Sequence, residues 1–192
     1  MFIETEKTPN PETLKFMPGK PLLAGKTAEF TDEDEAERYS PLAFRLLTLG
    51  GIKHVFIASD FVSVTKDDTW DWSVLKPTIL TALLQHFTFD EPVVYDSFFD
   101  KQDKVKVTRK DMSAQDAEIV DQIQALLDER VRPAVAQDGG DIEFDDFRDG
   151  VLYLRMRGAC AGCPSSTMTL KAGIENMMKH YIPEVQEVRE SL

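Results

Sequence analysis

Cysteine is scarce in this sequence. Only Cys160 and Cys163 occur among the 192 residues. A disulfide between residues three apart closes too short a loop to restrict the unfolded chain much, so a structural staple is a poor explanation of the pair. Metal binding or redox chemistry is the better interpretation.

Basic residues are also few. There are 22 Lys and Arg against 34 Asp and Glu, giving a net charge of −12. Such a chain repels phosphate backbones and anionic lipids, so we expect no nucleic-acid partner and no membrane partner. The sequence contains no apolar run of the roughly 20 residues that a membrane helix needs.

The first residues lack the features of a targeting segment. Met1–Glu6 has neither the basic start and apolar stretch of a signal peptide nor the Arg-rich, acid-poor character of a transit peptide. We therefore expect a cytoplasmic protein of a bacterium. A processed form in the mitochondrial matrix is the alternative.

The chain as a whole has the composition of a folded protein, with 42% hydrophobic and 29% charged residues. Its length suits two small domains, and its patterns predict the α+β class, with helices packed on a small mixed sheet in each domain. We assign the N-terminal domain to residues 1–92 and the C-terminal domain to 113–192. Residues 93–112 mix both charges with few candidate core residues, and we interpret them as a linker.

In the N-terminal half, short alternating segments predict strands, and proline marks two helices. Ser40 is a candidate N-cap before Pro41, and a second helix is expected to begin near Pro77. The expected strands are Ile3–Glu6, Thr13–Met17, Ile52–Ala58 and Phe61–Thr65.

The C-terminal half is predicted to alternate helices and strands. Ser113 and Asp116 form a capping box before a helix that Pro133 is expected to end. Asp149-Gly150 predicts a tight turn between two strands. A long helix and a closing strand follow, so the full set after the first helix is Asp141–Phe147, Val151–Arg157, Pro164–Tyr181 and Val185–Val188.

The two cysteines lie where a strand is expected to pass into this long helix. Pro164 suits the first helical position, which would place Cys163 at or near the N-cap. Unpaired N–H groups and the positive end of the helix dipole would then lower the thiol pKa and favour the metal-binding thiolate. Gly158 and Gly162 would let the backbone turn closely around Cys160.

Two thiolates do not complete a common metal site. Iron–sulfur clusters and Cys₄ zinc sites usually take four thiolates, so we expect two chains to share one centre. The histidines His54, His86 and His180 are weak substitute ligands at their positions in the sequence. A centre shared between chains is easily exposed, which suits delivery better than storage.

Two other chemistries fit a Cys-x-x-Cys pair. A thiol–disulfide oxidoreductase would use Cys160 as nucleophile and Cys163 as the resolving thiol. A zinc-bridged structural dimer is the second alternative. Upstream, Asp138-Gly139-Gly140-Asp141 either forms a turn into a strand or tunes the site, and the turn is the simpler interpretation.

Several blocks of the sequence resemble the Nfu (NifU-like) family of iron–sulfur cluster scaffolds. The cysteine segment and its continuation to Val185 are similar to the family's C-terminal domain, as is the upstream segment. The start of the chain resembles the family's N-terminal domain. The blocks are Arg157–Thr167, Gly173–Asn176, Arg132–Asp141, Phe2–Glu6, Thr8–Pro11 and Leu14–Phe16.

The resemblance implies a function and a set of ligands. It implies a non-enzymatic carrier whose Cys160 and Cys163 bind a cluster bridged between two chains. That cluster would be [4Fe–4S], with [2Fe–2S] or zinc as alternatives. The resemblance also implies a homodimer or higher oligomer, cluster-assembly proteins as donors and apo iron–sulfur proteins as recipients.

Overall fold

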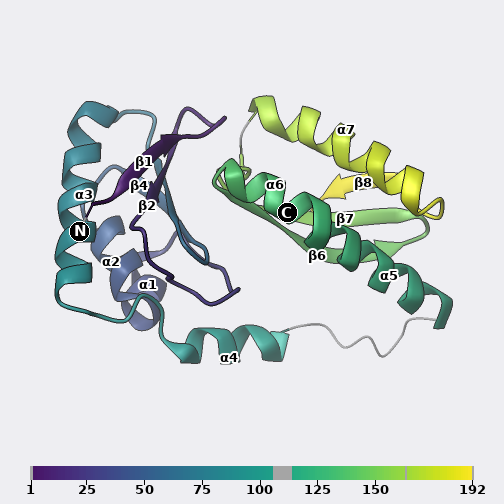
Figure 1. The fold of residues 1–192 in the computed structure, drawn as a ribbon, viewed down its shortest axis with the longest axis horizontal. Coiled ribbons are helices and arrows are strands. Elements are labelled where there is room, and N and C mark those ends of the chain that lie inside the picture. Colours follow the sequence, from purple (N-terminus) through teal and green to yellow (C-terminus); the bar gives the residue numbers. More distant parts are fainter. Residues whose placement is uncertain (1, 106–113, 163, 192) are drawn as a thin grey trace. The chain divides into compact units, whose positions relative to one another are not determined.

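The structure is a computed structural model that describes residues 2–105, 114–162 and 164–191, with the backbone alone at 101–105, 114–115 and 164–169 (Figure 1). The chain divides into two compact units, Met1–Lys106 and Val107–Leu192. Helices accompany a small sheet in each unit, which confirms the α+β class. Within the described residues, no helix is both long enough and apolar enough to cross a membrane.

Unit 1 is built on a five-stranded sheet with the order β1-β2-β5-β4-β3. Every pairing in the described residues is antiparallel, and β4 and β5 form the predicted hairpin. Of the expected strands, the second has its predicted bounds, and each of the other three differs by one residue at one or both ends. The strands are β1 (Glu4–Lys7), β2 (Thr13–Met17), β3 (Ala28–Phe30), β4 (Ile52–Ile57) and β5 (Val62–Lys66).

Three helices of unit 1 begin at side-chain caps. Ser40 accepts a hydrogen bond from the Ala43 N–H, as predicted for the helix that begins at Pro41. The second predicted start, near Pro77, is wrong: Asp71 caps the helix by accepting from the Ser73 N–H at 2.7 Å, and Pro77 lies inside it. The helices are α1 (Glu33–Tyr39), α2 (Pro41–Leu47) and α3 (Trp72–Thr88).

A fourth helix, α4 (Asp96–Val105), lies within the segment interpreted as a linker. Phe98 is buried in the core of unit 1, where its ring centroid is 4.9 Å from that of Phe30. The Ser40 hydroxyl donates to the Val93 carbonyl at 2.6 Å. Residues 93–99 therefore pack on unit 1, the backbone of α4 continues to Val105, and 106–112 lie outside the described residues.

Unit 2 begins with three consecutive helical segments. They are α5 (Ala114–Leu126), a π-helical turn η2 (Leu127–Val131) and α6 (Arg132–Gln137). The prediction that Pro133 ends the first helix is wrong, because the wider π turn precedes the proline and Pro133 takes an early position of α6. The proposed cap Ser113 lies outside the described residues.

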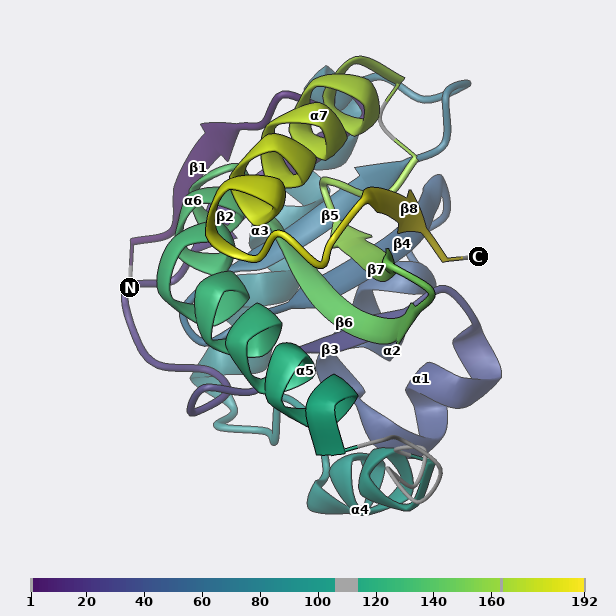
Figure 2. The same ribbon diagram turned by 90° about the vertical axis from the view of Figure 1, so that its right-hand side faces the viewer.

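The sheet of unit 2 has the order β6-β7-β8 and is mixed (Figure 2). β6 (Gly140–Arg148) and β7 (Val151–Gly158) are antiparallel, and β8 (Glu187–Glu190) runs parallel to β7. The predicted turn joins β6 to β7, with positive φ at Asp149 and Gly150. The long helix α7 (Pro164–Tyr181) matches its predicted bounds.

The core of unit 2 lies between this sheet and the helices, which cover one of its faces (Figures 1 and 2). Along β7, alternate side chains enter the core, as the alternating pattern of the strand requires. Their neighbours on the opposite face are half-buried. The core-facing residues of β7 are Leu152, Leu154 and Met156.

Candidate metal centre

The cysteine segment forms a tight turn directly after β7. The Cys160 N–H donates to the Arg157 carbonyl at 3.3 Å, and the Ala161 N–H donates to the Gly158 carbonyl at 3.1 Å. Gly158 and Gly162 have φ values of 61° and 65°, a region that side chains disfavour. The two glycines therefore have the turning role that the sequence predicts.

Cys160 points into unit 2. Cys160 is 4% exposed and belongs to the hydrophobic core of unit 2. A Cβ placed on Gly140 would overlap the Cys160 Sγ and would lie 2.9 Å from the Arg157 carbonyl oxygen. Gly140 is thus required here for space, whereas Gly139, with φ of 80°, is required for its backbone conformation.

An ion pair between a half-exposed arginine and a buried carboxylate anchors the strand that begins at Gly140. The Nε and Nη2 atoms of Arg132 each donate to one oxygen of Asp141 at 2.9 Å. Asp141 is buried, and its carboxylate also accepts from the Ile142 N–H at 2.8 Å. Hydrogen bonds to Asp141 raise the pKa of the Arg132 guanidinium, which stays charged. The pair fixes α6 to the first residues of β6.

Two further arginines precede the turn, on the face of β7 that points away from the core. Arg157 Nη2 lies 2.6 Å from a Glu143 oxygen, and Arg155 Nη2 lies 3.0 Å from an Asp145 oxygen. Both cations therefore have carboxylate partners on β6. This arrangement favours a strand-face role for these arginines over neutralisation of a bound cluster.

The second cysteine, Cys163, lies outside the described residues. Pro164 begins α7, as predicted, but the N-cap role of Cys163 and its influence on thiol pKa stay predictions. Among the residues that the structure describes, no three His, Cys, Asp or Glu side chains gather into a metal-binding group. With two cysteines in the whole sequence, one chain does not supply four thiolates.

The three histidines lie apart from the cysteine turn in their contacts. His54 Nε2 contacts Glu29 at 2.7 Å, and His86 Nδ1 lies 3.3 Å from Glu91; both histidines belong to unit 1. His180 is exposed near the end of α7. Their surroundings give no support to a ligand role.

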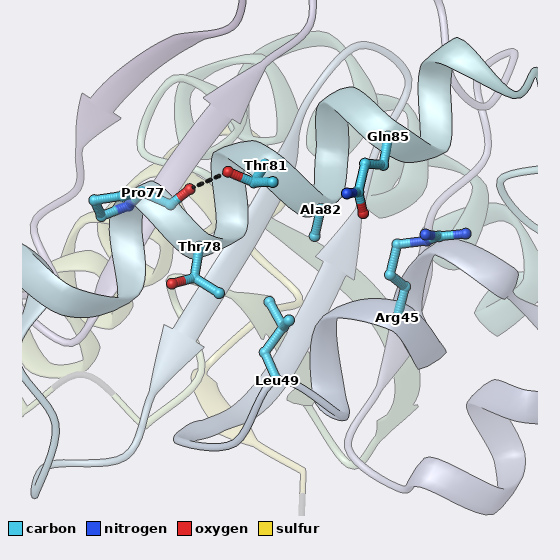
Figure 3. Close-up of a pocket in the computed structure, with 7 residues that line it drawn as sticks. All are labelled: Arg45, Leu49, Pro77, Thr78, Thr81, Ala82 and Gln85. Atoms are coloured by element: carbon cyan, nitrogen blue, oxygen red, sulfur yellow. Dashed lines mark hydrogen bonds between the residues drawn. The ribbon is translucent and has the colours of Figure 1, made fainter.

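A separate hollow of about 320 Å³ lies between α2 and α3 in unit 1 (Figure 3). Its lining combines one cation with small, apolar and neutral polar side chains, and the Thr81 hydroxyl donates to the Pro77 carbonyl at 2.9 Å. The lining offers no thiol, imidazole or carboxylate for catalysis or metal binding. The residues are Arg45, Leu49, Pro77, Thr78, Thr81, Ala82 and Gln85.

The ligand role of Cys160 and Cys163 stays a prediction, and the residues that support Cys160 were not predicted from the sequence. Gly140 and Asp141 were assigned mainly to a turn, and the Arg132–Asp141 pair was not foreseen. The available signal was the glycine doublet, in which one glycine serves the turn and the next serves a close contact. The partner of that contact, Cys160, lies in the turn after β7, and local sequence does not reveal the contact.

Comparison with known proteins bears directly on this arrangement. The fold and the cysteine turn define a two-unit α+β protein with a Cys-x-x-Cys between strand and helix. Residues 3–91 match the family "Scaffold protein Nfu/NifU N terminal", and residues 123–189 match the "NifU-like domain" family. The chain belongs to the Nfu (NifU-like) family of iron–sulfur cluster scaffold proteins.

Individual relatives are similar over almost the whole chain. NifU-like protein 4, mitochondrial, of Arabidopsis thaliana is 45% identical over 99% of this chain and 66% of its own length. The human NFU1 iron-sulfur cluster scaffold homolog, mitochondrial, is 43% identical over 99% of this chain and 72% of its own. The chain therefore spans about two thirds of the length of these relatives.

Among solved structures, the solution NMR structure of a NifU-like protein from Saccharomyces cerevisiae is 27% identical. The match covers 50% of this chain and 86% of the yeast chain, with a TM-score of 0.45. The name of the human relative describes an iron–sulfur cluster scaffold, not an enzyme, and both the human and the Arabidopsis relative are named as mitochondrial proteins. These names support the mitochondrial alternative of the sequence analysis, whereas a bacterial cytoplasm stays a prediction.

Proposed function

We propose that this chain carries an iron–sulfur cluster, of the [4Fe–4S] type, between two copies of itself. Cys160 and Cys163 of each chain supply the four thiolates. The cluster is cargo, received from cluster-assembly proteins and passed to apo iron–sulfur proteins. The observation that carries the proposal is the Cys-x-x-Cys turn between β7 and α7 in a chain with no other cysteine.

Membership of a scaffold family supports an iron–sulfur cluster as the cargo. The chemistry of the thiolate ligands supports a cluster shared between two chains. Thiolates are the usual ligands of iron–sulfur clusters, and four are needed for the common types. When each chain supplies half of the ligands, the cluster can be released as the two chains separate. Such a site suits transfer better than permanent retention.

Single substitutions at the cysteines test the ligand assignment. Cys160→Ser and Cys163→Ser are each expected to abolish cluster binding after anaerobic reconstitution, because each removes two of the four shared thiolates. The absorbance of the reconstituted cluster measures the loss, and circular dichroism checks that the fold is kept. Retention of a full cluster by either variant would contradict the assignment.

Transfer is tested with a separate recipient. The cluster-loaded chain is mixed anaerobically with an apo [4Fe–4S] enzyme whose activity requires its cluster. We expect activation faster than with equivalent free iron and sulfide. Activation at the same rate as with the free ions would contradict a carrier role while leaving cluster binding intact.

A further inference from the structure

Cys160 is buried inside unit 2. To bind a cluster that is shared with a second chain, its side chain would have to leave this position. The residue is 4% exposed, and its sulfur lies against the Cα of Gly140. We propose that Gly140 forms a seat that shelters the Cys160 thiol, and that the turn of residues 158–162 must move this side chain outward before it binds a cluster. This inference deepens the proposed function and rests on it for the ligand role of Cys160.

The seat depends on the missing side chain of Gly140. A Cβ there would overlap Sγ and would also lie 3.0 Å from the Cys160 backbone nitrogen, closer than most real Cβ contacts. The neighbouring atoms belong to backbone at Arg157 and Cys160, which yields less readily than a flexible side chain. Even an alanine at position 140 would therefore displace the thiol or the turn.

The start of β6 around Gly140, which forms the floor of the seat, is held by several contacts. The bidentate contact of Arg132 with Asp141 fixes the residue next to Gly140, and both of its N–O distances are 2.9 Å. The Ala159 N–H donates to the Gly139 carbonyl at 3.1 Å, which ties the turn to the same strand start. Gly140 is paired with Gly158 at the end of the β6–β7 ladder.

On the opposite side of the turn, Gly162 is exposed, and a Cβ added to it would meet no atom of the described residues within 4 Å. Gly158 and Gly162 flank Cys160, and glycine passes between backbone conformations at little cost. A metal–thiolate bond is about 2.3 Å long, so a metal shared with a second chain requires the sulfur at the surface. While seated, the thiol is protected from alkylation and oxidation.

Alkylation kinetics test the seat without any cluster. In full-length Cys163→Ser, Cys160 is the only thiol, and its reaction with iodoacetamide is followed by mass spectrometry in buffer and in urea. We expect the folded chain to react at least about 10-fold more slowly than the unfolded chain, because the turn must open first. Equal rates in the two conditions would overturn the proposal.

Adding Gly140→Ala to this chain is expected to raise the folded-state rate by about 10-fold, since the seat is then filled. The matched control is Gly173→Ala, where a Cβ would meet none of the described atoms within 4 Å and the rate should not change. A folded Gly140→Ala chain that reacts at the parent rate would contradict the role of Gly140.

If Gly140→Ala does not fold by circular dichroism, Asp141→Asn decides in its place. It loosens the floor of the seat and should accelerate alkylation by about 3-fold or more. Asp128→Asn alters an exposed partner of the same arginine and should not accelerate alkylation. Equal alkylation rates in the Asp141→Asn and Asp128→Asn chains would count against the proposal. If Cys160 reacts slowly in Cys163→Ser but the unsubstituted chain takes up no cluster on reconstitution, the seat is upheld and the proposed function is refuted. If Cys160 reacts fast in Cys163→Ser but the unsubstituted chain binds a cluster, the proposed function is upheld and the seat is refuted.

Discussion

At the scale of single residues, the support of the cysteine turn depends on one buried carboxylate. Asp141 is 6% exposed and accepts from both Arg132 and the Ile142 N–H. The cation is less buried, with a side chain 40% exposed, so water can screen part of its charge. Loss of the carboxylate therefore costs less than breaking a fully buried pair.

Asp141→Asn is expected to lower the free energy of unfolding of unit 2 by about 1–3 kcal/mol, because it leaves the arginine without its bidentate partner. Urea denaturation followed by circular dichroism measures the change. Asp128→Asn is the matched control: it removes the exposed partner of Arg132 and should cost less than about 1 kcal/mol. Equal losses for both variants would contradict the structural role of Asp141.

His86 makes a second residue-scale prediction, on pH. Burial is the main cause that lowers the pKa of His86 below its usual 6.5, against the opposing charge of Glu91. As the pH falls, the unfolded chain therefore binds a proton on this histidine before the folded chain does. The stability contributed by neutral His86 is complete above about pH 6.5 and is lost as the pH falls toward the lowered pKa.

We expect His86→Gln to flatten the pH dependence of unit 1 stability below about pH 6.5, where one proton contributes at most about 1.4 kcal/mol per pH unit. Urea midpoints at several pH values between about 5 and 8 measure the slope. His180→Gln, at an exposed position, should leave the slope unchanged. An unaltered slope in His86→Gln would refute the assignment.

At the scale of elements, the ring of Phe98 anchors α4 in the core of unit 1. Phe98 is 4% exposed and lies 4.9 and 5.7 Å, centroid to centroid, from Phe30 and Tyr39. Phe98→Ala is expected to destabilise unit 1 by about 3 kcal/mol and to expose 93–105 to protease. Phe89→Ala, at a residue that is 70% exposed, is the control and should do neither. Resistance of the Phe98→Ala chain to both tests would show that α4 is held by other contacts.

Elements with strong local signals were predictable from the sequence. Asp149-Gly150 requires a backbone conformation that few other pairs adopt readily, and the bounds of α7 follow from Pro164 and from the proline that comes after it. The start of α3 was misplaced because Pro77 is tolerated inside that helix, whereas Asp71 provides the actual cap. Local propensity did not indicate the π turn η2 before Pro133.

The sequence points to Cys160 and Cys163 as ligands, which stays a prediction, and it does not reveal the surroundings of Cys160. Cys160 is identified by the scarcity of cysteine and by the helix start that follows it. Its burial depends on Gly140, which is 20 positions earlier in the chain and meets it only because β6 pairs with β7. Contacts of this kind are fixed by strand register, which a single sequence specifies poorly.

At the scale of the whole molecule, charge is unevenly distributed. From Asp111 onward the sequence has 16 acidic and 8 basic residues. We expect this acidic half to favour recipients with basic surfaces, so cluster transfer should slow as salt is raised from about 0.05 to 0.5 M. Transfer rates to one recipient across that range measure the effect, and a rate independent of salt would remove the basis of this prediction.

The central claim is that two chains share one cluster through four cysteines. Anaerobic reconstitution with iron and sulfide, followed by Mössbauer spectroscopy and native mass spectrometry of one sample, tests it most directly. We predict one [4Fe–4S] cluster per two chains. Zinc at the shared site, or a chain without cluster whose two thiols cycle to a disulfide and reduce insulin, would contradict the claim and favour a structural zinc dimer or a thiol oxidoreductase.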